Sequence, residues 1–352
     1  ALTGFFFCFR KVKRKGQLLY NKYISKLRGN KTVRSNSNLH KAKKAKNDEF
    51  YTRLEDIEKE LTHYEGQFKD KIVLCNCDDP TWSAFWEYFH LNFTKLGLKK
   101  LISTHYEVDK PTYKMEYTGR NDNDIEIGIK TPLKVDGDFR SKECLNVLDE
   151  CDIVVTNPPF SLFRQYVAVL MEHKKKFLII GNMNAMTYKQ IFPLFKKNLL
   201  WYGASIHSGD RKFYVPDDYP LNAWGCGIDE NGKRFIRVKG VRWFTNFDYP
   251  SRHNFKLELQ ERYVPEKYPK YDDYDAINVN KVAEIPVDYD GVMGVPITFM
   301  DKYDSEQFEI LGMASSWDTS DEVKAIRTAS KCCSGPILNG NEIYKRILIR
   351  KK

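Results

Sequence analysis

The sequence predicts an α/β fold built on a doubly wound sheet, and three observations carry this prediction. Continuous apolar runs of strand length recur at residues 71–76, 152–156 and 176–181. Segments with helical spacing separate them, and a rigid polar turn follows the second run directly. Strands that are apolar throughout are buried on both faces, which in α/β proteins indicates a mainly parallel sheet covered by helices on each side.

The remaining elements follow in chain order. A helical pattern over residues 54–64 precedes the first strand, and an apolar segment over 82–98 reads as a helix feeding a second strand at 100–107. A helix over residues 163–171 then joins the runs at 152–156 and 176–181. Ligands of such sheets bind at the carboxyl ends of the strands, so the site is expected there.

Length and charge suggest three parts. A chain of 352 residues exceeds the usual size of one domain. Residues 1–46 hold fourteen Lys and Arg and no acid, which leaves 43 basic against 47 acidic residues in the rest of the chain. The net charge of +10 therefore does not describe the body of the protein, and any nucleic-acid contact outside residues 1–46 must come from local patches. We expect a basic leader over residues 1–38, which is either a phosphate-binding arm or a solvated extension, a catalytic domain over 39–205 and a mixed, loop-rich target-recognition region over 206–352.

Two classes of protein are disfavoured. No apolar run is long enough to cross a bilayer, and the aromatic cluster near the start lacks the pattern of a signal peptide. The eight cysteines show no ligand spacing with histidines, so we expect reduced thiols and no metal site. A cytoplasmic location is the corresponding expectation.

The sharpest motif is the turn Asn157, Pro158, Pro159 and Phe160, placed directly after the strand at residues 152–156. Two prolines fix φ and remove backbone donors, so the turn is rigid and offers carbonyl acceptors. The Asn157 amide oxygen and the Pro158 carbonyl can accept the two hydrogens of an exocyclic aromatic amine. They would thereby aim its lone pair at an electrophilic methyl group, while Phe160 stacks on the base. The alternative is a stiff turn that merely ends a strand.

The segment around this turn, residues 151–164 (CDIVVTNPPFSLFR), resembles the EcoRI-type adenine-specific DNA methyltransferases. The likeness spans the chain except for the basic leader and stretches near residues 110–130 and 315–340. It implies a monomeric type II restriction-modification enzyme that transfers methyl from S-adenosylmethionine to N6 of a flipped adenine in double-stranded DNA. A cognate endonuclease would act at the same site without forming a stable complex with it. The other segments that carry the resemblance are residues 40–44, 48–52, 75–80, 274–279 and 291–299.

Cofactor-binding candidates lie at the ends of the first two strands. The turn that begins Asn76, Cys77, Asp78, Asp79 has no glycine, unlike the usual turn in methyltransferases of this class. Its acids are suited to the methionine ammonium group of the cofactor, although two acids after a strand also serve as a solvated turn or a helix cap. Glu107 ends the second strand, where an acid typically accepts the ribose hydroxyls.

Two further cofactor candidates depend on the resemblance. Asp138 follows Gly137 in a loop similar to the one that holds the cofactor adenine, although a Gly-Asp pair is also a common hairpin connector. Phe50, Tyr51 and Thr52 resemble the segment that packs on the methionine end of the cofactor, and Asn157 adjoins it. The alternative for residues 50–52 is a hydrophobic lead-in to the first helix.

A basic and aromatic stretch at residues 231–256 is the DNA-binding candidate. It holds seven basic residues against a single acid, Asp248, with aromatic residues between them. Such a composition suits phosphate contacts and base stacking, but a strand pair with core aromatics and solvated cations has it too. The DNA-binding candidates are Lys233, Arg234, Arg237, Lys239, Arg242, Trp243 and Arg252.

Two rival functions remain open at this stage. Methyltransferases that act on RNA or on a protein glutamine need the same acceptors and share the Asn-Pro-Pro turn. A non-catalytic DNA-binding relative is the rival from another class, favoured by the missing glycines and opposed by the intact Asn157 and Phe160. The sequence does not reveal the target site.

Overall fold

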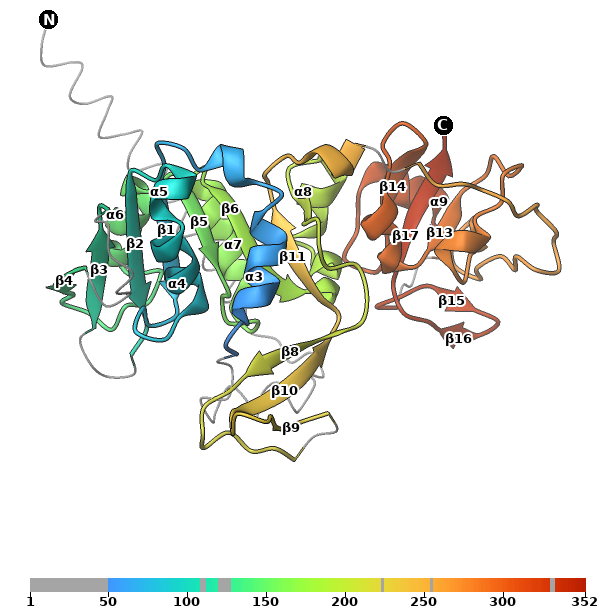
Figure 1. Ribbon diagram of the computed structural model, residues 1–352. Helices are drawn as coiled ribbons and strands as arrows, with labels where there is room; N and C mark the ends of the chain where they lie inside the picture. Colours follow the sequence, from blue (N-terminus) through green and yellow to red (C-terminus); the bar gives the residue numbers. More distant parts are fainter. Residues whose placement is uncertain (1–49, 108–111, 120–127, 223–224, 254–255, 330–332) are drawn as a thin grey trace, which may run out of the picture. The chain divides into compact units, whose positions relative to one another are not determined.

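The computed structural model describes residues 50–107, 112–119, 128–222, 225–253, 256–329 and 333–352, and the expected basic leader at 1–38 lies outside them (Figure 1). The described residues from 50 onward belong to one compact unit. Among them no helix is both long enough and apolar enough to span a bilayer.

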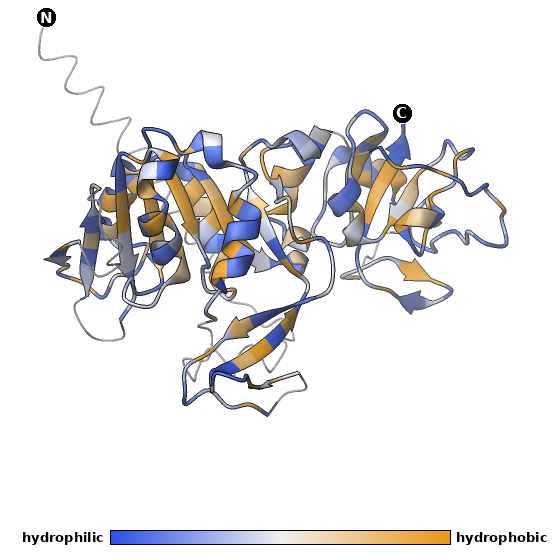
Figure 2. Cartoon of the chain, in the orientation of Figure 1, coloured by the Kyte–Doolittle hydropathy of each residue, from blue (hydrophilic) through white to orange (hydrophobic). Residues whose placement is uncertain are grey.

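Four parallel strands form the centre of an eight-stranded sheet. Strand β1 (Ile72–Cys77) pairs with β2 (Lys100–His105) on one side and β5 (Ile153–Thr156) on the other, and β5 pairs with β6 (Lys176–Asn182). Each of the apolar runs in the sequence is one of these strands. Figure 2 shows β5 and β6 as predominantly hydrophobic, as expected for strands buried on both faces.

Antiparallel strands flank this centre, so the sheet is mixed. On one edge β3 (Tyr113–Tyr117) pairs with β2, and β4 (Ile129–Pro132) pairs with β3. Because β3 follows β2 after a short connection, it returns antiparallel, since a parallel neighbour would need a longer crossover. On the other edge β11 (Val241–Thr245) lies between β6 and β7 (Trp201–Tyr202) and is antiparallel to both.

The position of β11 corrects the predicted division of the chain. The sequence placed the end of the sheet-bearing domain at residue 205, but β11 lies 36 residues beyond that boundary and completes the same sheet. A local pattern of apolar residues identifies a strand, but it does not say which earlier strand it will pair with. A cut at residue 205 would therefore divide the sheet.

Helices cover both faces of the sheet. Side chains alternate along each strand, so Leu74, Val154 and Ile179 enter one core, and Val73 and Val155 enter the other. The first core contains residues of α6 and α7, and the second contains residues of α3, α4 and α5, which confirms the doubly wound covering. The helices are α3 (Leu54–Leu61), α4 (Ala84–Leu91), α5 (Phe93–Leu96), α6 (Lys142–Glu150), α7 (Phe163–Glu172) and α8 (Phe192–Lys196).

The helix expected over residues 82–98 is divided in two. Ser83 caps the start of α4, its hydroxyl accepting the Trp86 amide, and α4 ends at Leu91. Asn92 interrupts the pattern before α5, which stops at Gly97 with a left-handed φ of 65°. A glycine takes up this conformation without strain, and it turns the chain directly into β2.

The chain between β7 and β11 forms a small three-stranded sheet that is separate from the main sheet. Its strands are β8 (Asp210–Tyr214), β10 (Arg234–Lys239) and β9 (Gly227–Ile228), with β10 in the middle and antiparallel to both neighbours. Gly240 alone separates β10 from β11. The chain thus passes from one sheet to the other within a single residue.

The carboxyl-terminal residues build a third sheet. Its strands are ordered β12, β13, β17, β14, and β17 runs antiparallel to both of its neighbours. Hydrophobic residues of this sheet join the same core as one face of the main sheet. The bounds are β12 (Ile277–Asn278), β13 (Met293–Val295), β14 (Phe308–Ala314), α9 (Asp321–Ile326), β15 (Ile337–Leu338), β16 (Asn341–Glu342) and β17 (Arg346–Lys351), with 3-10 turns at Glu65–Gln67, Met183–Thr187, Pro250–His253, Val282–Glu284 and Ile297–Lys302.

Candidate active site

The Asn-Pro-Pro-Phe turn lies at the carboxyl end of β5, in the middle of the main sheet. The carbonyl groups of Pro159 and Phe160 accept the Leu162 and Phe163 amides at 2.9 and 3.4 Å, so the turn leads straight into α7. Asn157 is 7% exposed. A short, rigid connection between a buried strand and a helix therefore holds the amide at the edge of the sheet where ligands of this fold bind.

A hydrogen bond orients the Asn157 side chain. Its Nδ2 donates to the backbone carbonyl of Phe50 at 2.7 Å, across 107 residues of sequence. With the amide nitrogen engaged, Oδ1 is the atom left to accept a hydrogen bond from a ligand. The structure thus connects the predicted catalytic residue with the predicted amino-terminal segment.

Aromatic rings surround this hydrogen bond. The Phe50 ring packs edge-on against Phe160 at 5.8 Å between centroids and lies 6.0 Å from Phe213 of β8. The Tyr51 ring lies 4.1 Å from that of Trp82, which is 44% exposed. Rings at these separations, tilted by 47–67° to one another, attract each other and form an apolar wall beside the turn.

Thr52 completes the amino-terminal segment. It is 6% exposed, and within the described residues its hydroxyl oxygen has no hydrogen-bond partner. A buried hydroxyl without a partner costs free energy, and such groups are usually satisfied by water or by a ligand. This unsatisfied hydroxyl is an observation consistent with a bound polar group at residues 50–52.

A residue other than glycine adopts a positive φ where β1 passes into the turn that follows it. Cys77 adopts a φ of 92°, a region that side-chain-bearing residues rarely occupy. Non-glycine residues in such conformations cost about 1–3 kcal/mol and cluster at functional sites. The chain thus lacks a glycine here, and the last residue of β1 adopts a φ that glycine usually supplies.

The neighbouring polar residues of this turn have different surroundings. The Asn76 side-chain oxygen accepts the Tyr166 hydroxyl, and its backbone carbonyl accepts the Thr156 hydroxyl, which ties β1 to β5 and α7. Asp78 is partly buried, with the Ser83 hydroxyl 3.5 Å from its Oδ2. Asn76 thus supports the sheet, whereas Asp78 lies at the partly open end of the turn.

Asp79 has the structural role that the sequence left open. Its Oδ1 accepts the Thr81 amide, the Thr81 hydroxyl and the Tyr113 hydroxyl at 2.7–2.8 Å. Burial alone would raise the pKa of Asp79, but these hydrogen bonds outweigh it and hold the pKa below its ordinary value. Asp79 therefore stabilises the turn and links it to β3.

The end of β2 contains a histidine that sequence reasoning missed. His105 is 5% exposed, and its Nε2 lies 3.3 Å from Asp79 Oδ2 and 3.8 Å from Glu107 Oε1. Burial lowers the pKa of His105, although Asp79 and Glu107 act in the opposite direction. Its position within the predicted strand at 100–107 was the available signal, and in the structure β2 ends at His105, two residues before Glu107. The side chain of Glu107 itself is 45% exposed and accessible.

The loop containing Asp138 packs against the end of β2. Gly137 has a φ of 79°, and a Cβ there would lie 1.9 Å from the His105 carbonyl oxygen, so only glycine fits. The Asp138 carboxylate accepts Arg140 Nε and the Arg140 backbone amide, both at 2.8 Å. Burial opposes ionisation of Asp138, but the contacts with Arg140 lower its pKa overall. Asp138 is thus at the predicted edge of the sheet, with its carboxylate engaged by its own loop.

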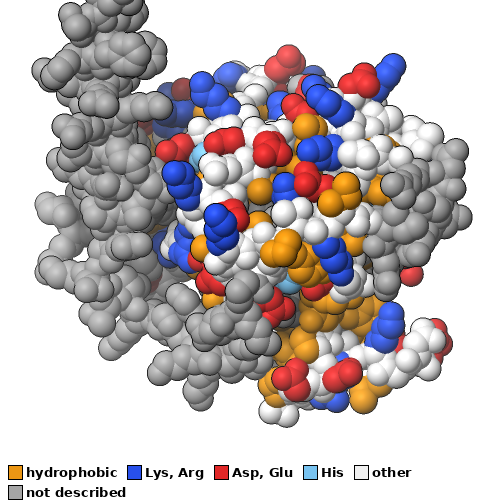
Figure 3. All heavy atoms as spheres, turned by 90° about the vertical axis from the view of Figure 1, so that its left-hand side faces the viewer, with side chains coloured by type: hydrophobic (Ala, Val, Ile, Leu, Met, Phe, Trp, Pro, Cys, Tyr) orange, Lys and Arg blue, Asp and Glu red, His pale blue; other side chains and the backbone are white. Residues whose placement is uncertain are grey.

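The basic candidates on β10 and directly before it are mostly exposed. Lys233, Arg237 and Lys239 face solvent, and Arg237 forms an ion pair with Asp210 at 3.2 Å. Arg234 is partly buried and donates to the Tyr219 carbonyl at 2.8 Å. Figure 3, which views the molecule from the β4 side, shows acidic and basic side chains interspersed over the coloured area. Neither sign dominates that face.

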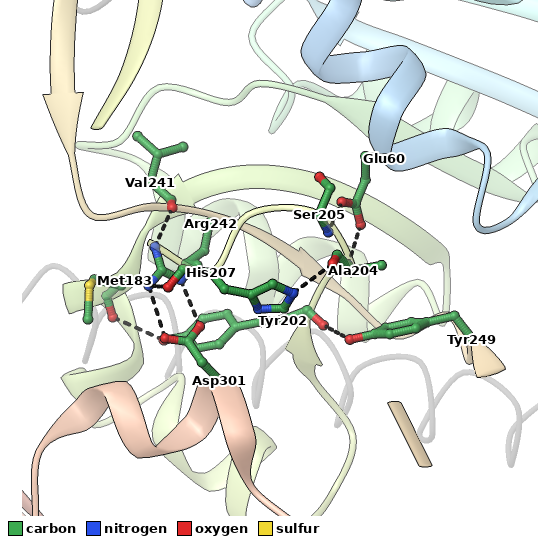
Figure 4. A network of polar contacts seen from close by, with 10 residues as sticks. All are labelled: Glu60, Met183, Tyr202, Ala204, Ser205, His207, Val241, Arg242, Tyr249 and Asp301. Atoms are coloured by element: carbon green, nitrogen blue, oxygen red, sulfur yellow. Dashed lines mark hydrogen bonds and ion pairs between the residues drawn. The ribbon is translucent and has the colours of Figure 1, made fainter. Parts of the chain in front are cut away.

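Arg242 and Trp243 are not surface residues, which corrects their assignment as DNA contacts. Arg242 is 2% exposed and its guanidinium forms a two-pronged ion pair with Asp301 at 2.8 and 2.9 Å, while also donating to the His207 carbonyl (Figure 4). Trp243 is fully buried and packs edge-on against Phe85. Both lie on β11, whose two faces are covered, so composition misled the sequence interpretation.

Arg252 lies far along the sheet from the catalytic turn. Its guanidinium stacks over the Trp201 ring at 3.5 Å and pairs with Asp248 at 3.3 Å. Trp201 is in register with Thr245, which is itself in register with Leu178 near the start of β6. Arg252 therefore lies toward the amino ends of the parallel strands, opposite to Asn157. A cavity of about 180 Å³ at this end is lined by Arg252 and none of the other predicted site residues.

Known proteins resemble this chain along most of its length. The model of the protein family described as "Adenine-specific methyltransferase EcoRI" matches residues 38–352. The type II methyltransferase M.EcoRI of Escherichia coli is 45% identical over 332 residues, which cover 90% of this chain and 97% of that protein. The type II methyltransferases M.MgeORF184P of Mycoplasma genitalium and M.MpnI of Mycoplasma pneumoniae are 40% and 39% identical, each covering 89% of this chain and 98% of the relative.

Proposed function

The chain belongs to the EcoRI family of adenine-specific methyltransferases, and from this premise we propose that the turn formed by Asn157, Pro158, Pro159 and Phe160 performs methyl transfer to N6 of a flipped adenine. The protein is a site-specific DNA methyltransferase of the kind found in type II restriction-modification systems. The proposal concerns which residues carry out the reaction and how.

The observation that carries the proposal is the hydrogen bond from Asn157 Nδ2 to the Phe50 carbonyl. An exocyclic amine of adenine is a weak nucleophile because its lone pair is delocalised into the ring. Acceptors on its two hydrogens keep the lone pair on nitrogen and direct it, which combines orientation with electrostatic stabilisation. Asn157 Oδ1, held in place by the engaged Nδ2, and the Pro158 carbonyl supply these acceptors.

Phe160 is proposed to hold the target base. It is partly buried, and its ring lies against that of Phe50. A base extruded from the duplex loses its stacking neighbours, and an aromatic side chain restores part of that stacking. The apolar wall beside the turn would also exclude water from the reacting atoms.

We propose S-adenosylmethionine as the methyl donor, which supplies a methyl group on a sulfonium with a good leaving group. Three features of the chain fit it: the unsatisfied buried hydroxyl of Thr52, the partly buried carboxylate of Asp78 and the half-exposed carboxylate of Glu107, two residues beyond β2. Asp78 would pair with its ammonium group and Glu107 would accept the ribose hydroxyls. Phe50 and Tyr51 would form the adjoining wall, with Asp138 near the cofactor adenine.

The substrate is double-stranded DNA, and we propose that the exposed cations of β10 contact its phosphates. Arg237 and Lys239 project from β10 and Lys233 directly precedes it, and the partner strand β8 reaches the wall beside Asn157 through Phe213. We further propose that the enzyme acts as a monomer and that an independent endonuclease recognises the same sequence. Target recognition would reside within residues 206–352, apart from β11.

The test is to incubate the protein with tritiated S-adenosylmethionine and unmethylated duplex DNA, beside an Asn157→Ala variant, and to identify the labelled base after digestion. Label in N6-methyladenine that is lost in the variant is the expected result. Transfer to RNA or to protein glutamine in parallel reactions, with none to DNA, would overturn the proposal in favour of a related Asn-Pro-Pro enzyme. DNA binding without any transfer would instead indicate a non-catalytic relative.

A further inference from the structure

The segment at residues 50–52 extends the small three-stranded sheet. Tyr51 donates its backbone N–H to the Tyr214 carbonyl at 2.8 Å, and Tyr214 donates its own to the Tyr51 carbonyl at 3.0 Å. This is an antiparallel bridge on the open edge of β8, because β10 pairs with the other edge. The backbone of Tyr51 is thereby fixed to the sheet that displays the cations.

The adjoining residue is fixed to the catalytic turn. Phe50 precedes Tyr51 directly, and its carbonyl accepts Asn157 Nδ2 at 2.7 Å. Neighbouring residues in extended chain are about 3.3 Å apart, so a small shift of the bridge must shift this carbonyl as well. Two short hydrogen-bonded contacts, one residue apart, thus connect β8 with the Asn157 amide.

Side chains reinforce the same connection. The Phe50 ring lies 6.0 Å from Phe213 of β8, 6.4 Å from Tyr219 and 5.8 Å from Phe160. The Tyr219 carbonyl in turn accepts a hydrogen bond from Arg234 on β10. Phe213 is 2% exposed, so this packing is part of the core and not a loose surface contact.

The cations lie on the strand next to β8. In the register of the two strands, Phe235 faces Tyr214 and Arg237 faces Lys212. Lys212 lies over the Phe235 ring at 4.4 Å, which joins the strands through their side chains as well. A displacement of β10 on binding DNA would therefore be transmitted to Tyr214 through the pairing of β10 with β8. From Tyr214 it would pass to Tyr51 and Phe50 through the backbone bridge.

We propose that Phe50 and Tyr51 are positioning residues which couple the seating of the small sheet on DNA to the orientation of the Asn157 amide. The inference rests on the proposed role of Asn157 and adds how that role depends on DNA contact. Methyl transfer would be efficient only when the sheet is seated, because the Phe50 carbonyl holds Asn157 Nδ2 and so presents Oδ1 to the target amine. Misplacement of a reacting group by about 1 Å can cost about 100-fold in rate.

The test compares two substitutions at the same position. Tyr51→Pro removes both the side chain and the N–H that donates to Tyr214, whereas Tyr51→Ala removes the side chain and keeps the N–H. We expect Tyr51→Pro to lower kcat, at saturating DNA and cofactor, by about 10- to 100-fold relative to Tyr51→Ala. The Kd values for S-adenosylmethionine and for DNA, measured directly by titration, should be the same for the two variants within about twofold.

A second pair of variants keeps the test decisive if a Tyr51 variant does not fold. Tyr214→Pro removes the other hydrogen bond of the bridge, and Tyr214→Ala is its matched control. Thermal unfolding identifies variants that are folded, and the same loss of kcat is expected from this pair. Equal kcat values for proline and alanine in a folded pair, or a loss confined to Kd, would overturn the coupling. An unsubstituted enzyme that transfers no methyl to adenine would instead contradict the proposed function, so the two failures are distinguishable.

Discussion

The consecutive strands β10 and β11 have similar compositions and opposite environments. Both mix arginine with aromatic and aliphatic residues, and only Gly240 lies between them. On β10 Arg237 and Lys239 face solvent, whereas every residue of β11 is buried, Arg242 included. The difference arises from pairing partners, since β11 lies between two strands of the main sheet and β10 between two short strands of the small one. Composition alone thus does not distinguish a solvent-facing strand from a core strand.

The largest effect that follows from this comparison is on stability. Replacing Arg242 by leucine leaves the Asp301 carboxylate buried without its partner, so the free energy of unfolding should fall by about 3–5 kcal/mol. Urea denaturation of the variant measures the change. The matched control is the double variant Arg242→Leu/Asp301→Leu, which should recover most of the loss because no uncompensated charge remains. A loss below about 1 kcal/mol accompanied by weaker DNA binding would contradict a core role for Arg242.

A smaller effect is expected at the residue that separates the strands. Gly240 has a φ of 72°, and an added Cβ would lie 3.1 Å from Met183 Cγ. Gly240→Ala should lower the free energy of unfolding by about 1–2 kcal/mol, since a side chain at positive φ is strained. Gly232 offers a control with a φ of 77° and open space around it. Equal losses for Gly232→Ala and Gly240→Ala would show that the contact with Met183 contributes nothing.

The smallest effect on stability is expected on β10. Arg237→Ala should change the free energy of unfolding by no more than about 0.5 kcal/mol, because the side chain is exposed. Its effect should instead be on DNA affinity, with the slope of log K against log salt falling by about 0.9 for one lost phosphate contact. Titrations at several salt concentrations measure this slope. Arg252→Ala, at the opposite end of the sheet, should leave the slope unchanged, and a change there equal to that of Arg237→Ala would refute the assignment.

Sequence reasoning succeeded where the determinant is local. The apolar runs of β1, β5 and β6, and the position of Asn157 after β5, follow from patterns contained in a few neighbouring residues. The insertion of β11 beside β6 brings together segments about 60 residues apart, and no local pattern encodes that pairing. The parallel centre of the sheet was therefore predicted from the sequence, whereas the antiparallel strands at both of its edges were not.

The site shows the same limit. The sequence identified Asn157 and the segment at residues 50–52, and the structure joins them through one hydrogen bond. It did not indicate that the Asp79 carboxylate accepts hydrogen bonds from Thr81 and Tyr113. The bond from Tyr113 forms only because β3 lies beside the turn. Nor could the absence of a glycine show that Cys77 adopts a glycine-like φ. Tertiary contacts decide which of several polar residues are available to a ligand.

The most direct test of the account is to measure the single-turnover methyl-transfer rate and the DNA dissociation constant together, for Asn157→Ala and Arg237→Ala. We predict that Asn157→Ala lowers the rate at saturating DNA by about 100-fold or more while the dissociation constant stays near that of the unsubstituted enzyme. Arg237→Ala should raise the dissociation constant by a larger factor than it lowers that rate. An Asn157→Ala enzyme that transfers methyl normally, or that loses DNA affinity as much as rate, would contradict the separation of chemistry on the β5 turn from DNA contact on β10.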